Sequence, residues 1–93
     1  MKQIIRKNFV FYGRVQGVGF RYRAKYAASL TGVTGWVKNR WDDTVEMELQ
    51  GTEEAIDRTL FLLDQGSFIR IEQTDVSFVD VRTDESRFRI EGT

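Results

Sequence analysis

The order of strand-like and helix-like segments constrains the fold of this chain more than any other feature of its sequence. Residues 8–14 are dense in aromatic and branched strand formers and predict a first strand. Residues 21–31 contain no glycine, carry alanine and leucine at helical spacings, and predict a helix that ends at Gly32. Residues 35–39 and 44–50 predict two strands joined by a hairpin-length turn, and the second alternates strictly between apolar and polar side chains.

The second half of the chain adds one more helix and two more strands. Thr52 is predicted to cap a helix whose apolar side chains recur at i, i+4 and i+7, and this helix is predicted to end at Gly66. A fourth strand is predicted within residues 68–81 and a short last strand within 86–91.

The resulting order, βαββαβ followed by a terminal strand, predicts the fold class. It is that of a ferredoxin-like α+β protein, with a mostly antiparallel sheet, two helices on one face and a short C-terminal strand. The 93 residues, 41% of them hydrophobic, suffice for one modest core, so residues 1–93 are predicted to form a single domain. This arrangement serves many functions and does not by itself select one.

Charge is distributed unevenly along a chain whose formal net charge is zero. Residues 1–41 contain nine basic and no acidic side chains, whereas residues 42–93 contain fourteen acids and five arginines. The asymmetry indicates an anion site built by the first half, or two halves that complement each other within one domain. The chain has no cysteine and no histidine, which excludes disulfides, thiolate metal sites and a histidine general base.

The loop before the first predicted helix offers the chemistry that an anion site needs. Gly17 and Gly19 allow consecutive N–H groups to turn toward one point, and the helix N-terminus favours negative charge. Arg21, Arg23 and Lys25 oppose the helix dipole unless an anion lies nearby. In the alternative interpretation, the glycines make a tight turn and the basic side chains are solvated. The loop is neither a P-loop nor a dinucleotide-binding fingerprint, because both motifs require residues that it lacks.

Two separated motifs make the pattern specific. Gly13 to Arg21 (GRVQGVGFR), followed by Gly32 to Asn39 (GVTGWVKN) and Val45-Glu46, resembles the acylphosphatase family in residue types, order and spacing. The resemblance covers essentially the whole chain and is densest from Gly13 to Gly51. It implies hydrolysis of the carboxyl–phosphate anhydride of a small-molecule acyl phosphate to a carboxylate and inorganic phosphate, with no metal and no cofactor.

The resemblance also assigns roles to individual positions. Arg21 corresponds to the arginine that binds the phosphoryl group, and Asn39 to the asparagine that holds the attacking water. The phosphate cradle corresponds to the backbone amides of Val15, Gln16, Gly17, Val18, Gly19 and Phe20. Taken alone, an asparagine beside a hairpin is more often a turn residue, and it is the surrounding motif that favours the water-holding role.

A few positions depart from what the family commonly shows, and the tryptophans have a structural interpretation. Asp43 stands where a glycine often closes the hairpin turn, and Ala24 stands where many members carry a hydroxyl or a larger side chain. Residues 66–68 lack a proline often found there. Trp36 and Trp41 are interpreted as core or hairpin packing rather than as a substrate platform.

A non-catalytic phosphate-, anion- or RNA-binding ferredoxin-like module is the main alternative function. The predicted strand 44–50 has no aromatic side chain and carries Glu46 and Glu48, and the acidic second half repels a phosphate backbone, so no nucleic-acid partner is expected. A domain serving inside a larger protein, such as a hydrogenase-maturation carbamoyltransferase, is a third interpretation, and a free-standing enzyme is favoured. No segment resembles an export signal or a membrane span, so a cytoplasmic monomer without a membrane partner is expected.

Overall fold

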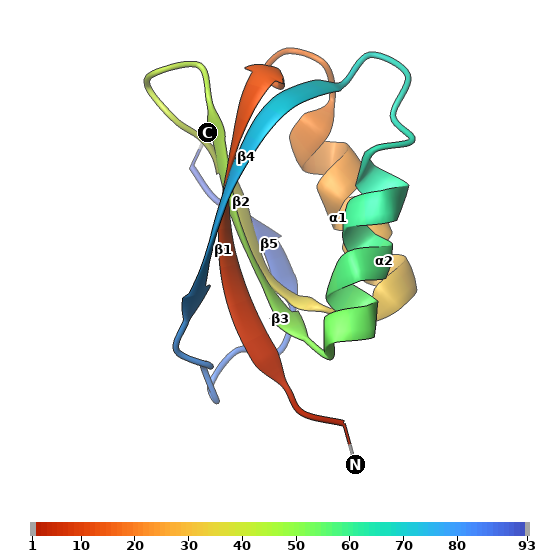
Figure 1. Cartoon of the computed structure of the whole chain (residues 1–93), viewed down its shortest axis with the longest axis vertical. Coiled ribbons are helices and arrows are strands. Elements are labelled where there is room, and N and C mark those ends of the chain that lie inside the picture. The colour runs from red at the N-terminus through yellow and green to blue at the C-terminus, as the bar shows by residue number, and fades with distance from the viewer. Residues whose placement is uncertain (1, 93) are drawn as a thin grey trace.

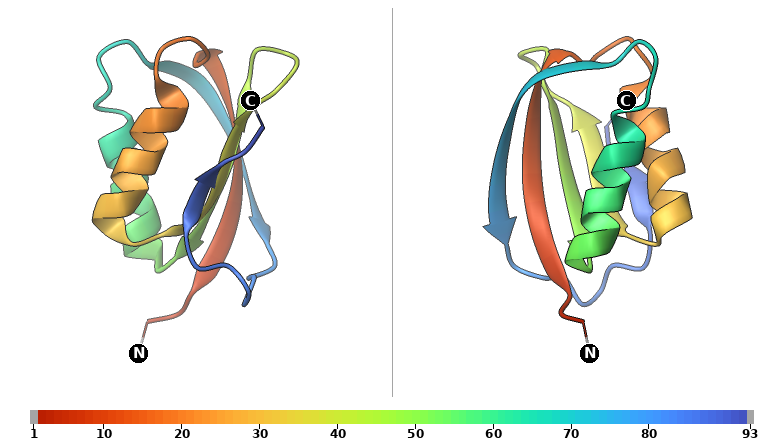
Figure 2. Two further views of the ribbon diagram at one scale, coloured as in Figure 1. Left: turned by 180° about the vertical axis from the view of Figure 1, so that it is seen from behind. Right: turned by 45° about the vertical axis from the view of Figure 1, so that its right-hand side comes forward.

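Alternating apolar side chains give the sheet one apolar face, and both helices cover that face (Figures 1 and 2). The computed structural model describes residues 2–92. In chain order the elements are β1 (Ile5–Arg14), α1 (Phe20–Thr31), β2 (Thr34–Asn39), β3 (Val45–Gly51), α2 (Glu53–Leu63), β4 (Arg70–Val79) and β5 (Phe88–Ile90). None of the helices within residues 2–92 is long and apolar enough to cross a membrane.

The sheet has the strand order β4-β1-β3-β2-β5. All neighbouring strands are antiparallel except β5, which runs parallel to β2. The predicted ferredoxin-like fold, with its mostly antiparallel sheet, two helices on one face and short C-terminal strand, is therefore confirmed. The parallel pairing matters for the site, because it makes β5 run in the same direction as the strand that ends at Asn39.

The predicted end of the first helix and the predicted N-cap of the second, Thr52, are confirmed, whereas the predicted end of the second helix is not. Gly32 ends α1 in the left-handed conformation (φ 81°), and its N–H donates to the Ala28 carbonyl over 2.9 Å. The prediction that Gly66 ends α2 is wrong, because the helix ends at Leu63 and Asp64 follows it in the right-handed conformation (φ −68°). The chain therefore leaves α2 without needing a left-handed glycine.

Three phenylalanine rings join the sheet to the start of α1. Phe9 and Phe11 on β1 stack with 5.7 Å between ring centroids, and Phe11 lies 5.1 Å from the ring of Phe20. Each of the three side chains is at most 2% exposed. Because Phe20 is the first residue of α1, this packing fixes the helix N-terminus against the sheet.

The two tryptophans, both interpreted as core or hairpin packing, differ in burial. Trp36 is partly buried, with the Lys38 ammonium 5.4 Å from its ring centroid. Trp41 is 91% exposed, so the packing interpretation is wrong for this residue. Its position in the turn between β2 and β3 places it beyond the strands against which it would have to pack.

The same turn contains Asp43, the one non-glycine residue with a positive φ (68°) among residues 2–92. Because left-handed geometry is unfavourable for a residue with a Cβ, Asp43→Gly is expected to raise the free energy of unfolding by about 0.5–1 kcal/mol. Asp42→Gly is the matched control, since the Asp42 carboxylate accepts a hydrogen bond from the Thr44 hydroxyl (2.5 Å) and its loss should lower stability. Urea unfolding measures both, and an Asp43→Gly variant less stable than wild type would contradict the strain argument.

Candidate active site

The loop between β1 and α1 and the end of β2 enclose a small pocket. Its volume is about 200 Å³, and it is lined by Val15, Gly17, Gly19, Phe20, Arg21, Tyr22 and Asn39. The structure thus brings together both predicted catalytic residues and four of the six predicted cradle residues. Gln16 and Val18 do not line the pocket, and Tyr22 is a lining residue that the sequence did not single out.

Backbone geometry, rather than lack of space, explains the two loop glycines. Gly17 (φ 70°) and Gly19 (φ 79°) are both left-handed, and a Cβ added at either would meet no atom within 4 Å. A side chain at these positions would therefore strain the backbone that aims the loop amides.

The N-terminus of α1 is open to an anion, in contrast to that of α2. Gly19 is the N-cap residue of α1 and provides no side-chain hydrogen bond, and the first turn contains no acid. At α2 the Thr52 hydroxyl accepts from the Ala55 N–H over 3.1 Å, and Glu53 and Glu54 occupy the first turn. The uncapped amides of α1 and its dipole therefore favour negative charge at the pocket.

Side chains of the loop hold it in place from behind. Val15 is 1% exposed and belongs to the core, and Val18 packs against that core. The Gln16 amide donates to the carbonyl oxygens of Arg40 and Thr44, each over 2.8 Å. These two hydrogen bonds fix the loop to the turn that follows Asn39. The sequence did not predict this role of Gln16. The one signal for it was a polar amide among apolar residues and glycines.

Asn39 is a strand residue whose side-chain oxygen has no hydrogen-bond partner among residues 2–92. It pairs with Val45 across β2 and β3, and its backbone φ is not in the left-handed region, so the turn interpretation is wrong. Its Oδ1 is buried and accepts no hydrogen bond from residues 2–92. A buried acceptor left unsatisfied costs about 1–3 kcal/mol, a penalty that a water molecule or a ligand in the pocket would remove.

Of the three basic residues at the start of α1, Arg21 alone lines the pocket. The Arg23 Nε donates to the Leu62 carbonyl over 3.0 Å, and its guanidinium lies 5.7 Å from the Tyr26 ring centroid. Residues two positions apart on a helix lie on different faces, so Arg23 does not face the pocket as Arg21 does. Its hydrogen bond to Leu62 links α1 to α2 instead. Lys25 follows Arg21 by four residues and lies on the same face of α1.

Pairing between the two halves of the chain explains part of the charge asymmetry of the sequence. Four basic side chains of the first half pair with acids of the second: Lys2 with Glu54, Arg6 with Glu48 and Glu85, Lys38 with Glu46, and Arg40 with Asp42. Arg21 lines the pocket. Within residues 2–92 no group of three or more His, Cys, Asp or Glu side chains could hold a metal ion.

Comparison with known proteins identifies what this arrangement is similar to. The family model described as acylphosphatase matches residues 7–90. The acylphosphatase of Geobacillus kaustophilus (strain HTA426) is 45% identical over 86 residues, which are 91% of this chain and 92% of that protein.

Solved structures agree with these relatives. The crystal structure of acylphosphatase from Bacillus subtilis has a TM-score of 0.86 and 32% identity, covering 97% of this chain and 100% of that one. The acylphosphatase structure from Coxiella burnetii has a TM-score of 0.84 and 28% identity, covering 95% and 93% of the two chains. The predicted activity, hydrolysis of acyl phosphates, is confirmed at this level of similarity. The chain belongs to the acylphosphatase family.

Proposed function

We propose that Arg21 and the backbone amides of residues 15–20 bind the phosphoryl group of an acyl phosphate, and that Asn39 holds the attacking water. One observation carries this assignment: the buried, unpartnered Oδ1 of Asn39 belongs to a side chain in the same pocket as Arg21 and the glycine loop. A water that donates a hydrogen bond to this oxygen would lie beside an anion held by the loop.

The reaction needs only groups that this pocket contains. The water oxygen forms a bond to phosphorus while the bond from phosphorus to the acyl oxygen breaks, and the carboxylate leaves with the electron pair. A carboxylic acid has a pKa of about 4, so the leaving group departs without protonation. Arg21 and the loop amides stabilise the charge on the phosphoryl oxygens, which is the main demand of phosphoryl transfer. The side chain of Asn39 orients the water but is no base, so the proton goes to a phosphoryl oxygen.

We further propose that residues 1–93 act as one domain, as a cytoplasmic monomer that uses no metal and binds no nucleic acid. The matches over 92% and 100% of the lengths of two relatives support the single domain. The exposed face of the sheet carries Glu46 and Glu48, whose charges disfavour a phosphate backbone. Size-exclusion chromatography with light scattering tests the monomer, and an RNA gel shift at low salt tests the absence of nucleic-acid binding.

Asn39→Ala tests the water-holding role. Loss of the amide is expected to lower kcat for benzoyl phosphate, in excess chelator, by about 10²–10³-fold, as for loss of one positioned polar group at a reacting centre. Stability should stay equal or rise, because the variant removes a buried acceptor that has no partner within residues 2–92.

The matched control is Asn8→Ala. The Asn8 amide donates to Glu46 and Glu48, each over 2.9 Å, and lies outside the pocket. This variant should lose stability and keep its kcat. A folded Asn39→Ala protein with the wild-type kcat would remove Asn39 from the reaction.

A further inference from the structure

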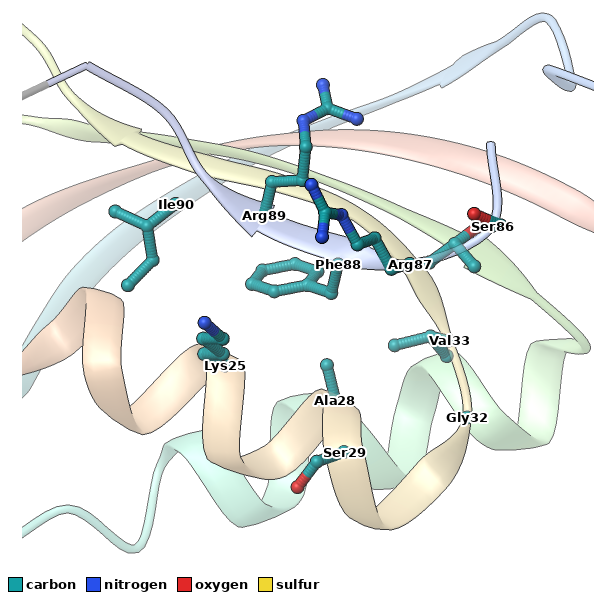
Figure 3. Close-up of a pocket in the computed structure, with 11 residues that line it drawn as sticks. Lys25, Ala28, Ser29, Gly32, Val33, Ser86, Arg87, Phe88, Arg89 and Ile90 are labelled. Atoms are coloured by element: carbon teal, nitrogen blue, oxygen red, sulfur yellow. The ribbon is translucent and has the colours of Figure 1, made fainter. Parts of the chain in front are cut away.

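The structure contains a second hollow, which is larger than the catalytic pocket. It is a groove of about 650 Å³ between α1 and β5, and Figure 3 shows its two walls. Ala28, Val33, Phe88 and Ile90 form an apolar floor, and Lys25, Arg87 and Arg89 lie at its rim. The groove shares no lining residue with the catalytic pocket.

The two hollows lie along the same face of α1, one helical turn apart. Arg21, Lys25, Ala28, Ser29 and Gly32 follow the spacing of one helix face, and all but Arg21 line the groove. Lys25 lies four residues beyond Arg21, which is about 6 Å along the helix axis. A ligand held at Arg21 therefore reaches the groove within one helical turn.

Strand β5, which forms the opposite wall of the groove, also has one end near the catalytic pocket. Ile90 pairs with Val37, two residues before Asn39, and β5 runs parallel to β2. The Ile90 end of β5 is thus the end nearest the catalytic pocket. Figure 3 shows Ile90 beside the N-terminal part of α1, and Ser86 toward the other end of the groove.

Among residues 2–92, two of the three cations at the rim have no acidic partner. The Arg89 Nε donates to Glu91 over 3.0 Å, and Arg89 also lies 3.9 Å from Glu85, so its charge is balanced. The side chains of Lys25 and Arg87 form no ion pair with residues 2–92. The Lys25 ammonium points across the groove toward β5 (Figure 3). The groove therefore combines an apolar floor with two cations, Lys25 and Arg87, that no acid among residues 2–92 balances.

We infer that this groove binds the acyl part of the substrate, and that it favours acyl phosphates carrying a second anionic group beyond an apolar segment. This inference rests on the proposed function, which places the phosphoryl group at Arg21. The apolar segment would cover Ala28 and Phe88, and the distal anion would lie between Lys25 and Arg87. These two residues would then determine specificity without taking part in the chemistry.

The test compares two substrates of equal size and different charge. We would measure kcat and KM for 4-carboxybenzoyl phosphate and for 4-carbamoylbenzoyl phosphate, with benzoyl phosphate as reference. Wild type is expected to show a lower KM for the carboxylated substrate. Lys25→Gln and Arg87→Gln should each raise that KM by up to about fivefold, leaving kcat and the KM of the carbamoyl substrate unchanged.

Arg58→Gln is the matched control, because Arg58 is an exposed cation on α2 outside the groove. It should leave the ratio of the two KM values at the wild-type level. A wild-type enzyme that hydrolyses all three substrates with equal KM values, or a ratio that Arg58→Gln changes as much as Lys25→Gln, would overturn the groove assignment alone. Absence of benzoyl phosphate hydrolysis by wild type would instead contradict the proposed function.

Discussion

Replacement of Arg21 by glutamine is expected to lower kcat for benzoyl phosphate by about 10³–10⁵-fold, the range found where an arginine stabilises a phosphoryl transition state. Arg21 is the one basic side chain that lines the catalytic pocket, and it follows directly after the loop whose amides complete the cradle. Its planar guanidinium can donate two parallel hydrogen bonds to phosphoryl oxygens. Arg21→Lys keeps the charge but not this geometry, so its kcat should fall between those of wild type and Arg21→Gln.

Arg23→Gln is the matched control, because it removes one positive charge from the same helix at a residue that does not line the pocket. Arg23 lies two residues further along and binds the Leu62 carbonyl instead of facing the pocket. This variant should keep its kcat and lose about 1 kcal/mol of stability, the usual contribution of one hydrogen bond. The assignment fails if Arg21→Gln, folded by circular dichroism, retains kcat within tenfold of wild type.

The sequence predicted the fold well because the relevant signals are local. The strict alternation in residues 44–50 settles which face of β3 is buried, since Val45, Met47 and Leu49 have no exposed surface. Gly32 has the left-handed geometry for which glycine is favoured at a helix end, and this preference is why its presence predicted the end of α1. Where local signals were ambiguous the prediction failed, as at Gly66, because a glycine three residues past a helix end resembles a cap in sequence alone.

The site was predictable in its residues but not in its supports. Arg21 and the loop glycines are close together along the chain, so one motif identifies them. The hydrogen bonds of Gln16 to Arg40 and Thr44 cross 24 and 28 residues, and no local pattern reports such contacts. Asn39 stands between these cases. Its residue type favoured a turn, and only strand pairing with Val45 and an unpartnered Oδ1 exclude that interpretation.

Replacement of Arg6, a buried arginine on the sheet face opposite the helices, is expected to lower the free energy of unfolding more than any other single substitution considered above. Arg6 is 1% exposed on β1, and its guanidinium donates to Glu48 (2.6 Å) and Glu85 (2.7 Å). Glu85 belongs to the segment between β4 and β5, so this cluster joins β1 and β3 to the chain that leads into β5. Arg6→Met leaves two carboxylates without their cation and is expected to lower the free energy of unfolding by about 3–5 kcal/mol.

A compensating variant separates lost charge balance from lost packing. Because well-packed neutral groups often replace a buried ion cluster at little cost, the triple variant Arg6→Met, Glu48→Gln, Glu85→Gln should recover much of the stability lost in Arg6→Met. Urea unfolding of both proteins at pH 7 measures the difference. If the triple variant is no more stable than Arg6→Met, packing of the arginine stem and not its charge dominates.

The pH dependence of stability gives an independent test, because the contribution of Glu85 to it should have opposite signs in wild type and in Arg6→Met. In wild type, burial raises the pKa of Glu85, but hydrogen bonds from Arg6 and Thr34 outweigh it and leave the pKa below the ordinary value of 4.5. A lowered folded-state pKa contributes stability that is present above 4.5 and is lost as the pH falls through the folded value. In Arg6→Met the burial, which is the largest single cause, remains, while the hydrogen bond and the charge of Arg6 are lost. The hydrogen bond from Thr34 and the charges of Arg82 and Arg89 remain but are weaker than the burial, so the pKa of Glu85 should rise above its unfolded value. That variant should therefore gain stability between pH 7 and pH 5, where wild type stays constant. Parallel pH profiles for the two proteins would show that Arg6 does not hold Glu85 in its charged form.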